Sequence, residues 1–322
     1  MGCVIDVSVV HIVRERGIMF ELSPAEQELL PSDDDVEFYQ QHGWFVTPRL
    51  FTDEEVDAAS AALAIHHSGK RDRTLPITLD DMDDWTEGSA HQIRFNDHVA
   101  LTSERLGSFM LQPIIGAIAA RLARTSQIRL WLSSLIYKPP HTEVTLEWHA
   151  DRVHWHTCTS TKMLSAWIAL QDCDESMGPV VMIDGSNRWP DTEQIRAVRY
   201  NDKFFRGDSP EKADSMLESI DMPIRRVPLL LRKGQVSFHS CMTIHGSGSN
   251  LSNRARVGLI VHMQDSANRY QKVYDEAGNL HSHVNDQMCG RLPNGDVDYS
   301  DPKICPVLWE TTESGASGDL LA

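Results

Sequence analysis

The feature that most constrains the fold of this chain is a series of short strand-like segments between residues 127 and 265. These segments are rich in β-branched and aromatic residues, and turn signals such as Gly178-Pro179, Asp184-Gly185 and Lys233-Gly234 separate them. They read IRLWLSSLIYK, EVTLEWHAD, KMLSAWIAL, PVVMID, QVSFHS and RVGLIVHMQ. Many short strands in succession are typical of a double-sheet jelly roll or a cupin-like barrel. We therefore predict a mainly β fold.

The segment before these strands, residues 20 to 125, has the pattern of helices. Ser23 and Thr52 each open a capping box, and Ser32 precedes a short helical stretch that ends at Gly43. The stretch from 106 to 124 has the apolar density of one buried helix. We therefore expect α-helices to flank the β core.

The chain has 322 residues, and this length fits one large domain with a helical extension. The polar segment 187–226 interrupts the strands and holds a predicted helix opened by Ser209 and Pro210. Long insertions between core strands often cover a site, so we expect a lid-like role for it. The tail, 266–322, is rich in turn residues and has no clear chemical pattern. It could wrap the barrel or close the pocket.

Charge and hydropathy exclude several classes of partner. The formal net charge is −16 and the sequence pI is about 5.3, which argues against nucleic-acid binding and against docking on anionic lipid. No apolar run is long enough to span a bilayer, and the first residues do not resemble a signal peptide. The six cysteines are scattered, as expected for free thiols in a reducing compartment. We expect a cytoplasmic protein with a small-molecule substrate, and its oligomeric state stays open.

One short motif, Glu147-Trp148-His149-Ala150-Asp151, has the spacing of a metal site. On a strand, residues i and i+2 point to the same face, about 6–7 Å apart, so His149 and Asp151 can hold one metal ion. The best third ligand is His245, which lies on a separate predicted strand. Two imidazoles and one carboxylate form the facial triad of non-haem iron oxygenases. The His-x-Asp tripeptide alone is a weak signal, because it also occurs by chance.

A second signal is an arginine eleven positions after His245. Strand alternation places Arg254, Arg256 and Gly258 on one face, opposite an apolar face that begins at Ala255. A buried arginine needs an anionic partner, and the distal carboxylate of 2-oxoglutarate fits a guanidinium bidentately. The alternative is a surface strand with two solvated arginines.

With these residues in place, the chain resembles the phytanoyl-CoA dioxygenase family of Fe(II)- and 2-oxoglutarate-dependent oxygenases. The resemblance covers most of residues 35 to 265. It rests on HGWFVTPRLFTDEEV, YKPP, WHAD, AWIALQDCDESMGPVVMIDGSNRW and GQVSFHSCMTIHGSGSNLSNRARVGLIVH. It implies a double-stranded β-helix with helices packed outside. It also implies a dioxygenase that uses Fe(II), 2-oxoglutarate and O₂.

The resemblance assigns roles residue by residue. It implies that iron is held by His149, Asp151 and His245. The residues that match co-substrate positions are Arg256, Ser247, Trp167 and Lys138. Alternatively, Trp167 could simply pack in the hydrophobic core, and Lys138 could cap a strand without reaching the co-substrate. Asn187 stands where the family often has histidine after Gly-Ser, a departure in a turn. The carboxylate of Asp151 argues against halogenation, because related halogenases have a small residue there.

The motif continues as HADRVHWH, which suggests residues for substrate contact. Trp155 shares strand parity with the proposed ligands and is a candidate for the pocket wall. Arg152 and His154 are candidates for the pocket mouth. His154 and His156 could alternatively contribute to a zinc site. On a continuous strand their parity would keep them away from the metal of His149.

The reaction we expect is hydroxylation of an unactivated C–H bond of a small molecule, with natural-product or specialised metabolism as one candidate setting. Desaturation, cyclisation or epoxidation with the same cofactors is an alternative outcome. A metal-binding jelly roll without redox chemistry would need the triad but not Arg256. A zinc hydrolase would need a general base near the metal, and no motif such as HExxH is present.

Overall fold

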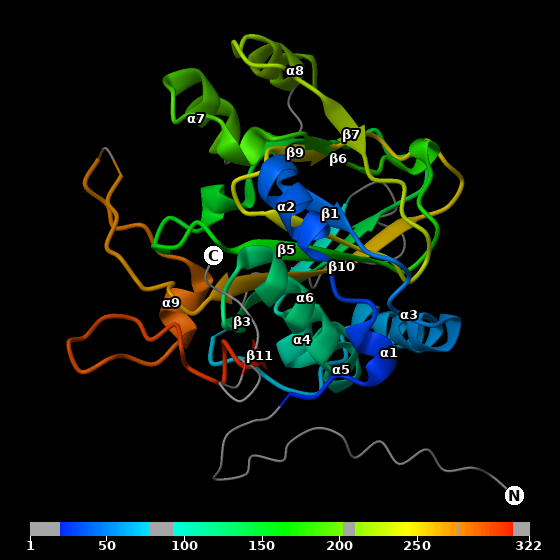
Figure 1. The fold of residues 1–322 in the computed structure, drawn as a ribbon, viewed down its shortest axis with the longest axis vertical. Coiled ribbons are helices and arrows are strands. Elements are labelled where there is room, and N and C mark those ends of the chain that lie inside the picture. Colours follow the sequence, from blue (N-terminus) through cyan, green and yellow to red (C-terminus); the bar gives the residue numbers. More distant parts are fainter. Residues whose placement is uncertain (1–19, 78–92, 202–209, 276, 312–322) are drawn as a thin grey trace, which may run out of the picture.

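Two antiparallel sheets form the centre of the molecule (Figure 1). The computed structural model describes residues 20–77, 93–201, 210–275 and 277–311. In spatial order, the larger sheet contains β1 (Trp44–Val46), β8 (Val236–Ser240), β5 (Leu164–Ala169), β10 (Arg256–Asp265), β3 (Gln127–Lys138) and β11 (Val307–Glu310), and β2 (Arg94–Asp97) also pairs with β3. The smaller sheet contains β4 (Leu146–His149), β9 (His245–Ser247), β6 (Val180–Ile183) and β7 (Arg226–Pro228). The predicted mainly β, jelly-roll core is confirmed.

Helices lie outside the sheets, as predicted. Those before the core are α1 (Pro24–Gln27), α2 (Asp33–His42), α3 (Asp53–His67), α4 (Val99–Thr102), α5 (Glu104–Met110) and α6 (Pro113–Ala123). The helices that follow β6 in the chain are α7 (Glu193–Arg199), α8 (Pro210–Glu218) and α9 (Val284–Met288). Capping boxes at Ser23, Ser32 and Thr52 open the first three, and α2 ends at Gly43 with a φ of 79°.

The prediction of a single helix over 106–124 was wrong, because the structure has two helices there. Helix α5 ends at Met110, and α6 begins at Pro113. A proline lacks the backbone N–H that a continuing helix needs, and its ring clashes with the preceding turn. At the first position of a new helix the same residue fits without cost.

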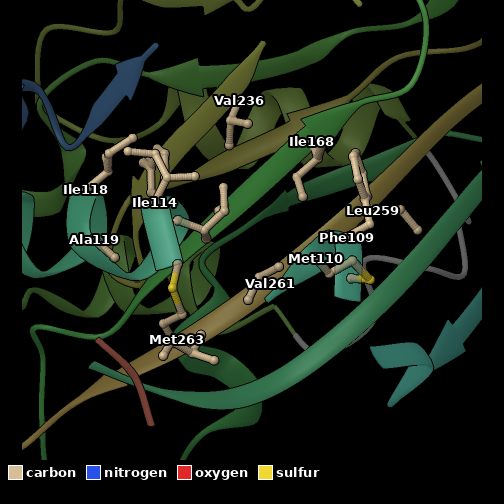
Figure 2. Packing of buried hydrophobic residues seen from close by; sticks show 14 of the residues in the cluster. Phe109, Met110, Ile114, Ile118, Ala119, Ile168, Val236, Leu259, Val261 and Met263 are labelled. Carbon is tan, nitrogen blue, oxygen red and sulfur yellow. The ribbon is translucent and has the colours of Figure 1, made fainter. Parts of the chain in front are cut away.

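The main hydrophobic core lies between helices α5 and α6 and the outer face of the larger sheet. Figure 2 shows Phe109 and Ile114 of these helices against Leu259, Val261 and Met263 of β10. Fully burying one side chain of this size is worth about 1.5–3 kcal/mol. Strand β10 therefore turns its apolar face outward, toward the helices.

The opposite face of β10 is the one that concerns function. Arg256, Gly258, Ile260 and His262 alternate with the core residues and face the smaller sheet. Strand β10 also pairs with both β3 and β5, so this face lies at the middle of the larger sheet. Polar side chains on it are consequently enclosed between the two sheets.

The segment 187–226 packs on the outer side of the smaller sheet. The Trp148 indole N–H of β4 donates to Asp214 of α8 at 2.8 Å, and Trp148 packs against the cluster that contains Ile195 and Leu217. The predicted helix start at Pro210 is confirmed, whereas Ser209 lies outside the described residues. These contacts place α7 and α8 behind the strand that carries His149.

Two further expectations concern membranes and cysteines. No single helix in the described ranges is long and apolar enough to cross a bilayer, although α5 and α6 pass such a test as a pair bent by 42°. The cysteines that the structure describes are all free and buried.

Candidate metal centre

A cavity of about 430 Å³ lies between the two sheets. Its walls come from β3, β5 and β10 of the larger sheet and from β4 and β9 of the smaller one. Three residues from the C-terminal tail, Ser282, His283 and Val284, complete it. No described residue of the segment 187–226 lines this cavity. Among the residues that the structure describes, the tail therefore contributes to the cavity wall and the segment 187–226 does not.

His149, Asp151 and His245 meet inside this cavity. One candidate ligand atom from each lies within 4.8 Å of the other two, and all three residues are buried. His149 ends β4, directly opposite His245 of β9, and Asp151 opens a 3₁₀ turn, Asp151–His154. The strand thus ends between the two residues of the His-x-Asp motif. No other group of three His, Cys, Asp or Glu residues within the described ranges comes this close.

Backbone carbonyls orient both imidazoles. His149 Nδ1 lies 2.7 Å from the carbonyl oxygen of Glu147, and His245 Nδ1 lies 3.0 Å from that of Thr243. A carbonyl oxygen can only accept, so each Nδ1 carries the proton and donates. The lone pair of each neutral ring is then on Nε2, the nitrogen that binds a metal in such an arrangement.

Burial sets the charge state of the three groups. It lowers the pKa of His149 well below its ordinary value and that of His245 to about 4. Burial acts to raise the pKa of Asp151, but the hydrogen bond from His239 and the charges of nearby imidazoles outweigh it and hold that pKa well below the usual range. Two neutral imidazoles and one carboxylate are the protonation states that metal binding requires.

Three polar residues behind Asp151 were missed from the sequence. Asp151 Oδ2 accepts a short hydrogen bond from Ser165 Oγ and another from His239 Nε2 at 3.0 Å. Ser165 Oγ also lies 2.7 Å from His262 Nδ1. Strand parity could have revealed His262, because it continues the inward series of Arg256 and Gly258.

Two buried cations lie side by side next to the cavity, and of these Arg256 lines it whereas Lys138 does not. Arg256 and Lys138 are directly paired in register on β10 and β3, with exposed fractions of 1% and 0%. Arg256 donates to the Gly178 carbonyl at 2.7 Å, and Lys138 donates to Ser247 Oγ at 2.9 Å and to the Gly248 carbonyl at 2.5 Å. Neither cation forms an ion pair with any carboxylate of the described residues.

Burial without an ion-pair partner among the described residues shifts the pKa of both groups. Burial, and then the charge of Arg256, lower the pKa of Lys138 well below its ordinary value. Burial lowers the pKa of Arg256 to about 10. The Nε of Arg256 is buried without a hydrogen-bond partner among the described residues. Arg254, by contrast, is exposed and pairs with Asp174 at 3.1 Å, so the alternative of a solvated arginine holds only for Arg254.

Trp167 of β5 lies beside Arg256. The guanidinium carbon is 5.9 Å from the centroid of the indole, whose buried N–H has no partner among the described residues. A Cβ at Gly258 would meet the indole nitrogen at 2.1 Å, so only glycine allows the ring to lie there. The indole lines the same cavity as the triad.

The residues present fit iron and 2-oxoglutarate. Two imidazole nitrogens and a carboxylate are the donor set of the facial triad. The Arg256 guanidinium, which has no anionic partner among the described residues, and the Trp167 indole N–H without a partner fit a dicarboxylate that reaches from the metal to Arg256.

The predicted substrate residues are distributed unevenly. Trp155 and His154 both line the cavity, because the 3₁₀ turn removes the strand parity that would have separated them. Arg152 is absent from the lining and donates instead to the carbonyls of Cys158 and Ser160. His156 stacks on His281 at 4.4 Å. Within the described residues, His154 and His156 belong to no three-residue metal cluster.

Comparison with known sequences places this site in a family. The model of the phytanoyl-CoA dioxygenase family matches residues 39–258. An ectoine dioxygenase of Bordetella bronchiseptica is 28% identical over 249 residues, which cover 71% of this chain and 74% of that protein. The mouse phytanoyl-CoA dioxygenase domain-containing protein 1 is 29% identical over 138 residues, 42% of this chain and 44% of that protein.

Comparison with solved structures supports the fold. The carbocyclase SnoK from nogalamycin biosynthesis, described as non-haem and α-ketoglutarate dependent, superposes with a TM-score of 0.63 at 24% identity, covering 86% of this chain and 96% of that one. EctD from S. alaskensis, solved with 2-oxoglutarate and 5-hydroxyectoine, gives a TM-score of 0.58 at 20% identity, covering 79% and 82%. The core is a double-stranded β-helix. The chain belongs to the phytanoyl-CoA dioxygenase family of iron- and 2-oxoglutarate-dependent oxygenases.

Proposed function

We propose that this dioxygenase hydroxylates an unactivated C–H bond of a small molecule, with iron held by His149, Asp151 and His245. The observation that carries the proposal is the pairing, within one cavity, of a facial triad with the buried guanidinium of Arg256, which has no anionic partner among the described residues. A metal-binding protein without redox chemistry would have no use for that cation. The family membership supports the same reading.

The co-substrate site that we propose uses four residues. Arg256 and Lys138 neutralise the distal carboxylate of 2-oxoglutarate, and Ser247, held by Lys138 at 2.9 Å, donates to the same group. Trp167 provides a flat wall beside Arg256 and fixes the path from carboxylate to metal. The bound iron, 2-oxoglutarate and O₂ together supply the oxidising power that breaks a C–H bond, with succinate and CO₂ as co-products.

The substrate, we infer, occupies the remaining part of the cavity, on the side of the tail. Trp155 is buried there and makes an edge contact with His262 at 5.3 Å. His154 and His283 line the same volume. The protein's task on this side is to orient one C–H bond toward the metal and to exclude water. Because Arg152 is engaged by backbone carbonyls, it contributes by fixing the 158–160 loop.

The reaction outcome has a second candidate. Structural relatives include a carbocyclase and an epimerase of nogalamycin biosynthesis, which form or rearrange bonds with the same co-substrate. These relatives also favour a substrate from natural-product metabolism, although the shared fold does not fix the outcome.

A substrate-panel screen tests the proposal. The purified protein is incubated with Fe(II), 2-oxoglutarate and O₂, and succinate is measured together with product mass. A gain of one oxygen mass indicates hydroxylation, loss of two hydrogens indicates cyclisation or desaturation, and an unchanged mass with succinate indicates epimerisation. The matched control is His245→Ala. If succinate never exceeds that control, with or without panel compounds, the oxygenase proposal is wrong.

A further inference from the structure

The two oxygens of the Asp151 carboxylate have different surroundings. Oδ1 faces His245, whose Nε2 is 3.7 Å away. Oδ2 receives hydrogen bonds from Ser165 and His239. Ser165 is 0% exposed and His239 is 5% exposed. One oxygen is therefore available to a metal, and the other is occupied by protein donors.

Proton positions in this network follow by elimination. If the Ser165 hydroxyl pointed at His262, its oxygen lone pairs would face Asp151 Oδ2 at very short range, which is repulsive. The hydroxyl therefore donates to Asp151. Since Ser165 Oγ has given its only proton, His262 Nδ1, at 2.7 Å, must be the donor to it.

The same reasoning fixes the tautomer of His239. Its Nε2 lies 3.0 Å from the carboxylate, and its Nδ1 is buried without a partner. A proton on Nδ1 would bury an unpaired N–H and turn the Nε2 lone pair toward an anion, at a double cost. The proton is therefore on Nε2, and the buried atom without a partner is Nδ1, which is an acceptor. A buried acceptor without a partner costs less free energy than a buried donor without one.

This arrangement matters for the number of open coordination positions. Three protein ligand atoms leave three positions of an octahedral iron open, and 2-oxoglutarate and O₂ need all of them. A carboxylate that chelated through both oxygens would take one of these positions. Hydrogen bonds to Oδ2 oppose chelation, because they would have to break for that oxygen to reach the metal.

We propose that Ser165, His239 and His262 are positioning residues that restrict Asp151 to ligation through one oxygen and so keep a coordination position open. The inference rests on the proposed iron site. It concerns residues that touch neither the metal nor the co-substrate in the proposed site. Loss of outer hydrogen bonds of this kind weakens metal affinity roughly 10- to 100-fold.

Asparagine and glutamine scanning tests the proposal, because the two amides imitate different imidazole nitrogens. The asparagine amide nitrogen lies near the Nδ1 position, and the glutamine amide nitrogen lies near the Nε2 position. His239 donates through Nε2 and His262 through Nδ1. We therefore expect His239→Gln and His262→Asn to retain metal affinity within a few-fold of wild type. His239→Asn, His262→Gln and Ser165→Ala should bind roughly 10- to 100-fold more weakly.

The readouts are the Kd for Co(II), used as the metal probe, and the charge-transfer band of the anaerobic complex with Fe(II) and 2-oxoglutarate. Weak variants, saturated with Fe(II), should lose intensity in that band, because a chelating carboxylate competes with the co-substrate. A role in packing alone would give the same order of Asn and Gln at both positions, and that result would overturn the proposal. Wild-type binding by all five variants would also overturn it.

His149→Ala separates this inference from the proposed iron site. If His149→Ala loses Co(II) while the five variants bind normally, only the positioning role is wrong. If His149→Ala binds Co(II) like wild type, the iron site itself is misplaced, and both proposals fall.

Discussion

The region around Asp151 and the region around Arg256 and Lys138 differ in whether protein groups of complementary character meet the charge. Around Asp151, the anion is matched by donors from Ser165 and His239. Around Arg256 and Lys138, two cations face carbonyls and a hydroxyl, and no carboxylate of the described residues balances them. In the first region protein donors already satisfy one oxygen of the anion before a ligand arrives, whereas in the second no anion of the described residues meets the two cations.

This difference separates two ways of binding. A metal ligand must be held in one geometry, so the surrounding residues satisfy the carboxylate oxygen that does not bind. A co-substrate that dissociates after each turnover must be held by favourable interactions that form only when it binds. The protein therefore leaves the cations that bind it without an anionic partner in the free state. The comparison predicts that mutations in the first region disturb the metal and that mutations in the second disturb 2-oxoglutarate.

The largest effect is expected at the metal ligands themselves. His149→Ala and His245→Ala each remove one of three protein ligands, so turnover should fall to background and iron affinity should be lost. Iron content after desalting and succinate formation measure this. Full turnover by either variant at saturating iron would show that the substituted histidine is not an iron ligand.

Removing the buried arginine should affect only the co-substrate. Arg256→Ala leaves the distal carboxylate without its bidentate partner, at a cost of about 2–5 kcal/mol, which is roughly a 30- to several-thousand-fold loss of affinity. Arg256→Lys should recover part of it, because an ammonium cannot reproduce the planar fork. The measurement is an anaerobic 2-oxoglutarate titration of the Fe(II) protein.

Arg254→Ala is the matched control for that titration, because Arg254 is exposed and paired with Asp174. Its titration curve should equal that of wild type. A larger defect in Arg254→Ala than in Arg256→Ala would place the co-substrate on the wrong arginine.

A smaller effect, with a pH signature, is expected at Lys138. Its pKa is depressed mainly by burial, so the ammonium charge is present below that depressed pKa and lost as pH rises through it. Affinity for 2-oxoglutarate should therefore fall with rising pH before Arg256, with a pKa of about 10, begins to lose its charge. Lys138→Met should lower affinity about 10- to 100-fold at neutral pH and abolish this pH dependence.

Lys138→Arg sharpens the same experiment, because it keeps a charge that does not titrate in that range. Its affinity should stay high and nearly independent of pH. A Lys138→Met variant that retains the pH dependence of wild type would show that another group titrates.

The smallest effect should appear on the tail side of the cavity. The His283 Nδ1 accepts from the backbone N–H of Asn285 at 3.1 Å, and the imidazole stacks on Trp131 at 4.7 Å. His283→Asn keeps a side chain suited to the cap and removes the ring. We expect the KM for the substrate found in the panel to rise about two- to tenfold, with unchanged titrations of iron and 2-oxoglutarate. A change in either titration would show that His283 also affects the binding of iron or of 2-oxoglutarate.

The sequence was sufficient to predict that His149, Asp151 and His245 lie together and that Arg256 lies on the inward face of β10. Alternation also placed Arg254 on that face, but β10 begins at Arg256, so Arg254 lies before the strand and is exposed. The spacing of His149 and Asp151 brought them together, although a strand was expected to continue where a 3₁₀ turn begins. Spacing predicts proximity here because adjacent residues have little freedom to diverge.

The sequence could not reveal which distant segment contributes residues to the cavity wall. The segment 187–226 looked like a lid because of its length and polarity, yet its described part contacts the outer side of β4. The tail reaches the cavity because it must travel from β10 to β11 at the far edge of the larger sheet. Such a path depends on strand order, which no local periodicity encodes. Ser165 was missed for a similar reason, since a small polar residue on a strand carries no distinctive signal.

The pairing of His149 with His245 also has a consequence for folding. These residues lie opposite each other on β4 and β9, and β4 is the edge strand of the smaller sheet. An ion shared between them would staple an edge strand to its neighbour across a long loop, which an unfolded chain cannot do. Saturating metal should therefore raise the free energy of unfolding by mass action, about 2.7 kcal/mol at a hundredfold excess over Kd. The amides of β4 should be the first to exchange with solvent when metal is removed.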